Sequence, residues 1–532
     1  MYKQQSLIRS LVILSVACCF TACKKDLDVQ PVNANTADKQ YSTPAGYKQV
    51  LAKAYGSYSL VSSTGVGNSD VNIAGITDAA TTDFVRSYWN LQELTTDNAI
   101  CAWNDGALQS FHKLNWTSNN VLIYATYARS LFQITVCNEF IRESDPAKVA
   151  ARNITGADAT DIAHYRAEAR FLRAYQYWVL MDLFGNPPFI TEKDPIGKFI
   201  PPQIQRADLF VYIENELKEI DTELAPVHQN EYGRADQGAA WALLARLYLN
   251  AKVYTGVERY SDAITYASKV INGGYNLKTS YKTLFMSDND QNNPEIILPV
   301  AYDAINSQNY GGTTFLVCST HGTNPADNQG HGIPGGGWLG NRSTKNLPLI
   351  FGDFSGNNDK RALFGPGSVD INDILTFNDG VGVYKFNNIS STGTTPPSPN
   401  GVLCSTDFPL FRLAEMYLVY AESVLRGGTG GSNSTALEYM NLLRERGFEN
   451  STNNFSTITL TDILNERQRE LYWEVCRRTD LIRYGLFTGG TYLWPWKGGV
   501  AAGTAVDDHF ALFPIPAAEI ISNPNLTQNP GY

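Results

Sequence analysis

The chain has 532 residues and a formal charge of −10; 43% of its residues are hydrophobic, 12% are aromatic and only 18% are charged. This much apolar sequence excludes global disorder, and the acidic balance disfavours a nucleic-acid partner held by phosphate neutralisation. Few charges beside many aromatic residues instead favour a neutral or cationic ligand.

The N-terminus resembles a bacterial lipoprotein signal. Lys3 and Arg9 precede an apolar run that begins at Leu11 and ends shortly before Cys23. The run is too short to span a bilayer, and its end is typical of cleavage before a cysteine that is then acylated. We therefore predict a signal peptide over residues 1–22, lipidation of Cys23 and a tether over 23–38. The alternative is ordinary signal cleavage, in which Cys23 has no special role.

Helical periodicity begins near Thr43 and returns over residues 119–143 and 158–184. The third of these segments has the strongest apolar stripe, and Gly185 followed by Asn and two prolines marks its end. Residues 61–120 lose the helical period and are rich in Gly, Ser, Thr, Asn and Asp, so we expect loops there.

Residues 234–272 predict a pair of helices of the tetratricopeptide type. Trp241 and Tyr248, with Leu and Ala between them, match the first-helix pattern of that repeat, and Ala263 and Ala267 follow in a second helix. Small residues at such positions let two helices approach closely. Irregular spacing makes the repeats degenerate.

A second helix pair is expected late in the chain, with its first helix near Leu413 and its second near Ala436. A third late helix is expected to begin near Leu460 and to continue through Tyr472 and Val475.

A long non-helical stretch separates the early and late helices, at about 287–406, and it opens with a short strand at 295–300. An insertion of this size in a compact protein is usually functional. The predicted fold is mainly α, a tetratricopeptide-like helical-repeat scaffold with long irregular loop insertions and a few short strands. We expect one domain over 39–532, with parts at 39–280 and 281–532.

Features of an enzyme or a metal centre are weak. The chain has no H-E-x-x-H, G-x-S-x-G or phosphate-binding loop, and the cysteines after Cys23 form no C-x-x-C pair, which favours buried thiols with at most one disulfide. His321 and His331 share a glycine-rich loop, but no third ligand is apparent, which disfavours a metal site. The acids of the predicted repeat helices are expected to form salt bridges with arginines rather than to act as glycosidase carboxylates: Glu168, Glu415, Glu466 and Glu470.

Several motifs together resemble the SusD/RagB family of outer-membrane nutrient-binding lipoproteins. They occur in order over nearly the whole chain that follows Cys23, and the match rests on their combination: residues 166–175, 182–185, 233–236, 239–246, 411–417, 466–470, 477–481, 514–516 and 528–532. The resemblance implies a lipid-anchored binding protein at the cell exterior that performs no chemistry on its ligand. Its implied partner is a SusC-like TonB-dependent transporter of the outer membrane, to which the protein delivers oligosaccharides.

Resemblance to starch-binding members of the family also implies a site. Trp103, Tyr310 and Trp338 would form an aromatic platform for sugar rings, and Arg86 and Asn104 would donate hydrogen bonds to sugar hydroxyls. Tyr310 and Trp338 each stand beside glycines, which suits a loop that presents a ring outward.

The chain departs from the starch-binding pattern at two positions. Cys101 stands where an indole is usual, and Gly106 stands where an amide is usual, so the platform is expected to be smaller or shaped for a different linkage.

Asp288 and Asp290 place carboxylates at alternate positions, as calcium-binding loops do, and the resemblance adds Asp407 as a third ligand. This arrangement predicts a structural Ca²⁺ and no catalytic cofactor; the alternative is a solvated acidic turn.

The sequence therefore predicts a cell-surface protein that captures starch or malto-oligosaccharides. One alternative keeps this role but changes the ligand to another glycan or to peptides. A second alternative is a helical-repeat scaffold that binds proteins without binding sugar. A glycosidase is the least supported class.

Overall fold

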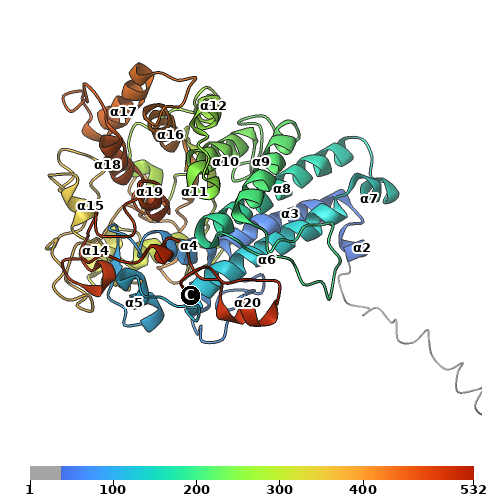
Figure 1. Ribbon diagram of the computed structural model, residues 1–532, viewed down its shortest axis with the longest axis horizontal. Helices are drawn as coiled ribbons and strands as arrows, with labels where there is room; N and C mark the ends of the chain where they lie inside the picture. The colour runs from blue at the N-terminus through green and yellow to red at the C-terminus, as the bar shows by residue number, and fades with distance from the viewer. Residues whose placement is uncertain (1–36) are drawn as a thin grey trace, which may run out of the picture.

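A computed structural model describes residues 37–532 (Figure 1). The predicted signal peptide, Cys23 and nearly all of the predicted tether lie outside the described residues. The fold is mostly helical with two pairs of short strands, which confirms the predicted fold class. Within residues 37–532, no helix combines the length and the apolar character that a membrane span requires.

The N-terminal part contains long helices joined by short ones. Its elements are α2 (Ala37–Gln40), α3 (Pro44–Ser59), η1 (Ala79–Thr82), α4 (Phe84–Gln92), β1 (Ile100–Cys101), α5 (Gly106–Lys113), α6 (Val121–Glu143), α7 (Pro146–Ala151), α8 (Ala157–Phe184), α9 (Arg206–Glu219), η2 (Ile220–Thr222), α10 (Gln237–Leu249), α11 (Ala251–Thr255) and α12 (Tyr260–Ile271).

The C-terminal part begins with irregular segments and returns to helices. Its elements are η3 (Lys282–Phe285), β2 (Ile296–Val300), α13 (Gly312–Cys318), α14 (Pro325–Gly330), β3 (Asn341–Arg342), α15 (Asn346–Leu349), β4 (Phe408–Arg412), α16 (Leu413–Leu425), α17 (Asn433–Phe448), α18 (Leu460–Leu471), α19 (Arg477–Arg483), η4 (Lys497–Gly499), η5 (Asp508–Ala511) and α20 (Ala517–Ser522).

Side-chain caps fix where the predicted helices begin. The hydroxyl of Thr43 accepts a hydrogen bond from the backbone N–H of Gly46, and the side chain of Asn120 accepts from the first turn of α6. Gly185, with a positive φ of 74°, ends α8 where the sequence predicts. Helices α3, α6, α8, α10, α12, α16, α17 and α18 all begin within a few residues of their predicted starts.

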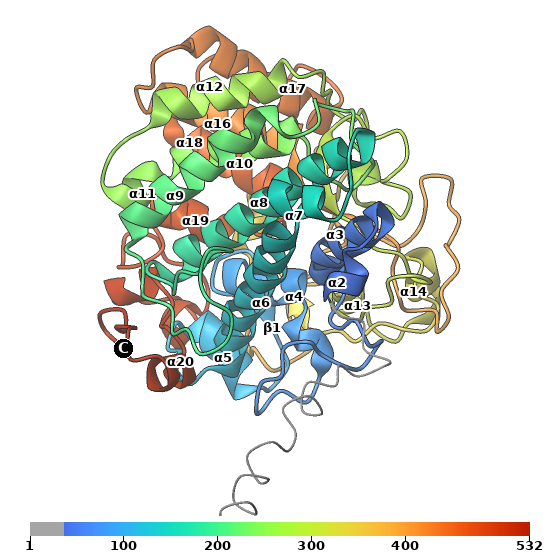
Figure 2. The same cartoon turned by 90° about the vertical axis from the view of Figure 1, so that its right-hand side faces the viewer.

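The helices pack in a row, in which α6 lies against α8, α8 against α9, and α10 against α12 (Figure 2). The predicted pair α10 and α12 packs closely through alanines that are fully buried, among them Ala242, Ala263 and Ala267. Helix α12 also packs against α16, which joins the early helices to the late pair α16 and α17 although a long insertion separates them in sequence. One apolar core extends along this row, from Tyr41 to Leu526.

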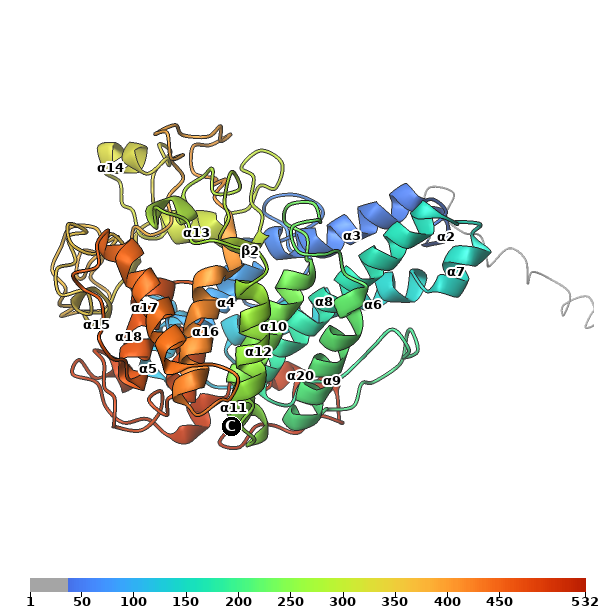
Figure 3. The same ribbon diagram turned by 90° about the horizontal axis from the view of Figure 1, so that it is seen from above.

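The insertion leaves the helical row and returns to it through a strand pair. Strands β2 and β4 are antiparallel, with Ile296 opposite Arg412 and Val300 opposite Phe408, and α16 starts directly after β4. The segment between these strands forms a layer that carries α13 and α14 on one side of the helices (Figure 3). The ends of the insertion are therefore held side by side on the scaffold.

The prediction of loops throughout residues 61–120 is wrong, because the segment contains α4 and α5. Every residue of α4 is buried, including Arg86, Asn90 and Gln92. Its apolar residues Phe84, Val85, Tyr88 and Trp89 do recur at helical spacing, but the helix has only 9 residues and lies within a stretch rich in turn-forming residues, so a period this short is easily overlooked.

The predicted continuation of the third late helix through Tyr472 and Val475 is also wrong, because α18 ends at Leu471. Two buried cations bind carbonyl oxygens at this point: Lys385 donates to the carbonyl of Tyr472 at 2.6 Å, and Arg412 donates to that of Glu470 at 2.7 Å. These contacts satisfy carbonyls that a further helical turn would need, so the chain leaves the helix there.

A network of buried ion pairs joins the base of the insertion to α17 and α18. Arg412 contacts Glu295 at 2.9 Å, Glu470 at 2.6 Å and Glu474 at 2.7 Å. Arg446 pairs with Glu295 at 2.8 Å and also with Glu470. Burial by itself would raise the pKa of Glu470, but the surrounding guanidinium groups outweigh it and hold that pKa far below its ordinary value.

We expect Glu470→Gln to lower the free energy of unfolding by about 3–5 kcal/mol, because it leaves buried guanidinium groups without their shared anion. Since the pKa of Glu470 is lowered in the folded state, its stabilisation is complete above its ordinary pKa of 4.5 and is lost as the pH falls below that value. Denaturant unfolding should therefore show that the difference in the free energy of unfolding between wild type and Glu470→Gln becomes smaller as the pH falls below 4.5.

Glu438→Gln is the matched control, because Glu438 lies exposed on α17. It should change the stability by less than about 0.5 kcal/mol. A Glu470→Gln protein as stable as this control would contradict a structural role for the ion network.

Candidate glycan-binding site

The predicted site residues lie on four segments that meet around α13. Arg86 lies in the first turn of α4, Trp103 follows β1, Tyr310 precedes α13, and Trp338 precedes β3. All three aromatic side chains are partly exposed, so each can offer part of a ring to a ligand, and Trp103 and Trp338 also pack against the apolar core.

The structure brings Tyr310 and Trp338 together. Their ring centroids are 6.4 Å apart with a tilt of 50° between the planes. The hydroxyl of Tyr310 accepts a hydrogen bond of 2.7 Å from the side-chain amide of Asn400, which fixes the outer end of the ring. Two tilted rings at this separation form a curved apolar surface of the kind that fits sugar C–H faces.

Trp103 and Arg86 form the second part of the site. The guanidinium of Arg86 lies 5.8 Å from the centroid of Trp103 and 4.9 Å from that of Phe315, a residue of α13. The indole of Trp103 lies directly over Gly340, where a Cβ atom would come within 2.3 Å of its Nε1. Gly340 is therefore required for the position of this ring.

The two parts are joined through the backbone. Cys101 and Asn341 are paired in the β1–β3 ladder, and the N–H of Ala102 donates to the carbonyl of Gly340 at 2.8 Å. The N–H of Trp338 donates to the carbonyl of Cys318, at the end of α13. Strand pairing thus places the Trp103 and Trp338 segments side by side, with α13 behind them.

A buried aspartate, Asp83, holds Arg86 and Tyr310 in place. Its carboxylate caps α4 by accepting from the N–H of Arg86, and it also accepts from the N–H of Gly312 at 2.8 Å and from the side chain of Asn309 at 2.6 Å. Burial raises the pKa of Asp83. Sequence reasoning missed this residue and also Phe315 and Asn400; the only signal was that Asp83 precedes a helix as an N-cap does.

A cavity of about 300 Å³ adjoins Tyr310. Its other walls come from residues 60–68, the start of η1 and residues 305–309. Asp78 also lines it, and its carboxylate pairs with Arg86 at 2.8 Å. The carboxylate of Asp78 is more than half exposed, so a ligand hydroxyl could take its place beside the guanidinium of Arg86. Donation to a ligand hydroxyl is the role that the resemblance gives to Arg86.

Asn104 is exposed, next to Trp103. Trp494 is buried, and Trp496 is partly buried and donates to the carbonyl of Ile371 at 3.0 Å. All five cysteines of the described chain are free thiols: Cys101, Cys137, Cys318, Cys404 and Cys476.

Among residues 37–532, Asp288, Asp290 and Asp407 do not form a group whose carboxylate oxygens all lie within 4.8 Å of one another. Asp288 accepts hydrogen bonds from the backbone and hydroxyl of Ser391, while Asp290 is exposed. Asp407 is buried and accepts from the hydroxyl of Tyr232 at 2.6 Å and from the N–H of Tyr302 at 2.8 Å. Protein donors thus occupy two of the three carboxylates, which does not fit a preformed calcium site. Calcium binding stays a prediction.

The acids considered for a glycosidase are all ion-paired, as predicted. Glu168 pairs with Arg234, Glu415 with Arg246, Glu466 with Arg361, and Glu470 with Arg412. These partners come from other parts of the chain, and Glu466 also pairs with Arg469 of its own helix, α18, at 3.1 Å.

Comparison with known proteins identifies the family. Residues 352–532 match the family described as "SusD family", and residues 72–249 match the one described as "Starch-binding associating with outer membrane". The chain is 34% identical to the starch-binding protein SusD of Bacteroides thetaiotaomicron, and the match covers 96% of both chains. It is 28% identical to a SusD-like protein of Bacteroides ovatus over 60% of this chain and 58% of that one.

Solved structures have the same fold. A SusD superfamily protein from Bacteroides thetaiotaomicron superposes with a TM-score of 0.70 at 21% identity, covering 92% of this chain and 100% of that one. Surface glycan-binding protein A from the same species, in complex with laminarihexaose, has a TM-score of 0.69 at 19% identity and covers 91% of this chain and 99% of that one.

The fold and the site define a class of carbohydrate-binding proteins rather than enzymes, associated with the outer-membrane surface. The chain belongs to the SusD family.

Asp407 provides a test of the calcium prediction. Burial, with the carboxylates of Asp290 and Asp303 nearby, raises the pKa of Asp407 to about 7. Because this value exceeds the unfolded value of 3.8, the protonated carboxyl favours the folded state, and that advantage is lost as the pH rises through about 7. In a chelator, we expect Asp407→Asn to be more stable than wild type near pH ~8, by about 1–3 kcal/mol, and this advantage should shrink as the pH falls from about 7 toward the unfolded pKa of 3.8.

Added Ca²⁺ would bind only the ionised carboxylate, so it should raise the melting temperature of the wild type at the higher pH and leave Asp407→Asn unchanged. An equal response of both proteins to Ca²⁺, or no response, would count against calcium at this position.

Proposed function

We propose that the chain captures starch-type malto-oligosaccharides at Trp103, Tyr310 and Trp338 and passes them to a SusC-like TonB-dependent transporter. The observation that carries this proposal is the pair of partly exposed rings of Tyr310 and Trp338, joined through α13 and the β1–β3 ladder to Trp103 and Arg86. The 34% sequence identity to a starch-binding relative, which extends over 96% of this chain, supports the ligand class.

The chemistry of the site suits a neutral sugar. Three rings can stack on the C–H faces of a short glucan at about 0.5–1.5 kcal/mol each, and a few net hydrogen bonds add about 1 kcal/mol each. The sum corresponds to a Kd between about millimolar and micromolar, which allows release as well as capture. Cys101 is a fully buried residue of β1, so it adds no ring to the platform.

Isothermal titration with maltoheptaose tests the ligand and the platform. We expect the Trp103→Ala/Trp338→Ala double change to weaken binding by about 5- to 100-fold, because it removes two stacking contacts. Trp241→Ala is the matched control: Trp241 is also partly exposed, but it lies on α10 and contacts Asp221.

No heat with any α-glucan would overturn the proposed ligand, and parallel titrations with laminarin fragments, xylan, inulin and peptides would show a different one. Full binding by the double variant would overturn the platform even where the ligand is right.

We infer from the N-terminal pattern that acylation of Cys23 anchors the protein at the outer membrane with its site outward. In a suitable bacterial host, Cys23→Ala should move the protein from the membrane fraction to the soluble fraction. Cys19→Ala is the control and should leave it membrane-bound. Release by the Cys19 change instead would place the lipid on another cysteine.

Affinity purification of the wild type from detergent-solubilised outer membrane tests the partner. We expect a TonB-dependent transporter to co-purify, and recovery of the protein alone would count against the delivery step.

A further inference from the structure

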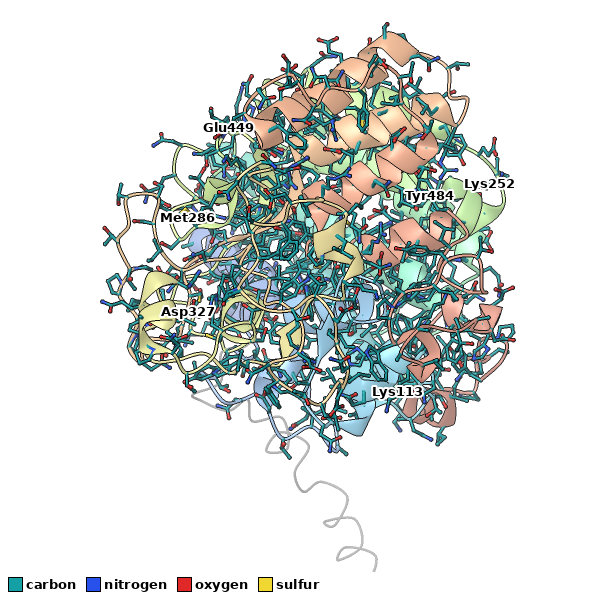
Figure 4. The ribbon with its side chains drawn as sticks, turned by 90° about the vertical axis from the view of Figure 1, so that its left-hand side faces the viewer. Lys113, Lys252, Met286, Asp327, Glu449 and Tyr484 are labelled. Atoms are coloured by element: carbon teal, nitrogen blue, oxygen red, sulfur yellow. The ribbon has the colours of Figure 1, made fainter. Side chains whose placement is uncertain are left out.

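Two histidines and an aspartate form a cluster in the insertion that the glycan site does not use. Within residues 37–532, only His321, Asp327 and His331 form a group of three such side chains whose ligand atoms all lie within 4.8 Å of one another. Asp327 belongs to α14, and the histidines lie on either side of that helix in sequence. Figure 4 shows Asp327 at the edge of the insertion, away from the helical row.

The sequence prediction of no third ligand beside the two histidines is wrong. The short helix α14 turns the chain back, so that the imidazole rings of His321 and His331 stack with centroids 4.0 Å apart. One carboxylate oxygen of Asp327 is 2.9 Å from Nδ1 of His321, and the other is 3.4 Å from Nδ1 of His331. Nδ1 of His331 lies closer, at 2.8 Å, to the backbone carbonyl of Asp327, so a proton on Nδ1 donates there and Nε2 is the nitrogen left for a metal.

We propose that His321, Asp327 and His331 bind a divalent transition-metal ion of the Zn²⁺ type. Two imidazole nitrogens and one carboxylate are a ligand set typical of zinc with a water in the fourth position, whereas Ca²⁺ and Mg²⁺ prefer oxygen ligands only. With metal–ligand bonds of about 2.0–2.2 Å, tetrahedral geometry separates neighbouring ligand atoms by about 3.3–3.5 Å. The three ligand atoms lie within 4.8 Å of one another, so side-chain shifts of about 1 Å bring them to this separation.

The surroundings of His321 support a ligand at this cluster. Its side chain is fully buried, and its Nε2 has no hydrogen-bond partner among the described residues. Each neutral tautomer of His321 therefore leaves an unfavourable contact. With the proton on Nδ1, the buried lone pair of Nε2 has no donor; with the proton on Nε2, the lone pair of Nδ1 faces the Asp327 carboxylate. A cation between Nδ1 and the carboxylate removes the second of these contacts.

The cluster is rigid on one side and open on the other. The ring of Tyr384 stacks on His321 with centroids 4.1 Å apart, which holds the imidazole in place. The side chains of His331 and Asp327 keep 19% and 26% of their surface exposed, so an ion and its water can enter. This combination of a fixed inner ligand and accessible outer ligands is suited to reversible metal binding.

The metal would lie directly behind the loop that presents Trp338. The N–H of Leu339 donates to the carbonyl of His321, and the N–H of Gly337 donates to that of Gly322. A Cβ atom on Gly337 would come within 2.0 Å of the carbonyl oxygen of His321, so the two segments touch. Metal binding would therefore hold residues 318–340 together.

The experiment is a Zn²⁺ titration of the mature chain, purified without a histidine tag and freed of metal with a chelator. Calorimetry should show one saturable site in the wild type. His331→Ala and Asp327→Asn should each weaken Zn²⁺ binding by at least about tenfold, because each removes one of three protein ligands. Both positions are partly exposed, and a melting curve in chelator checks that the variants fold.

His509→Ala is the matched control. His509 also lies 2.7 Å from a carboxylate, that of Asp507, but the pair has no second histidine. It should leave Zn²⁺ affinity unchanged. In the wild type, Zn²⁺ should also slow amide hydrogen exchange over residues 318–340, and this effect should be absent in His331→Ala.

Absence of a saturable Zn²⁺ site in the wild type would overturn the proposal. So would wild-type affinity in both His331→Ala and Asp327→Asn, or an equal loss in His509→Ala. These outcomes do not depend on whether the protein binds a glucan, because the metal is titrated without sugar.

Discussion

The fold depends on a set of charges that have been removed from water at the base of the insertion. Arg412 ends β4 and starts α16, and its guanidinium contacts acids from the segment before β2 and from the end of α18. Buried charges of this kind are costly unless every one is paired. The network therefore favours one arrangement of the strands and late helices, because any other arrangement leaves a charge unpaired. This requirement of mutual pairing fixes where the insertion leaves and rejoins the helical row.

The glycan site takes its geometry from that arrangement. None of its aromatic residues lies on a long helix, yet each is placed by a short element next to the scaffold. Trp103 follows β1, Tyr310 stands just before α13, and the N–H of Trp338 donates to the carbonyl at the end of α13. Asp83 extends this support to Arg86 from within the protein. A platform assembled in this way loses little conformational freedom when a ligand binds, because its segments are already ordered.

Sequence predicted the long helices well, because their caps and apolar stripes are local features. The capped start at Thr43 and the stop at Gly185 are both read from neighbouring residues. It failed for α4, whose helical period covers only 9 residues within a stretch rich in Gly, Ser, Thr, Asn and Asp. It also failed for the end of α18, where Lys385 and Arg412 from distant parts of the chain bind the carbonyls. The contacts at α18 are tertiary, and no local pattern reports them.

The candidate site also divides into residues that can be predicted from sequence and residues that only the folded structure brings together. Its aromatic residues were identified through resemblance, whereas Phe315 and Asn400 could be found only once the insertion was folded. Asp327 was missed as a partner of the two histidines for the same reason, since its spacing from each becomes meaningful only when α14 reverses the chain.

The pairing of β2 with β4 has a consequence for how such proteins diversify. Because the two strands hold the ends of the insertion together, the entropy of closing that loop changes only slowly with its length. Residues can then be added to or removed from its exposed loops while the residues that pair with the helices, such as Lys385 and Arg361, stay in place. Ligand preference can thus change through the loops that carry Tyr310 and Trp338, while Trp103, Arg86 and the helical row remain constant.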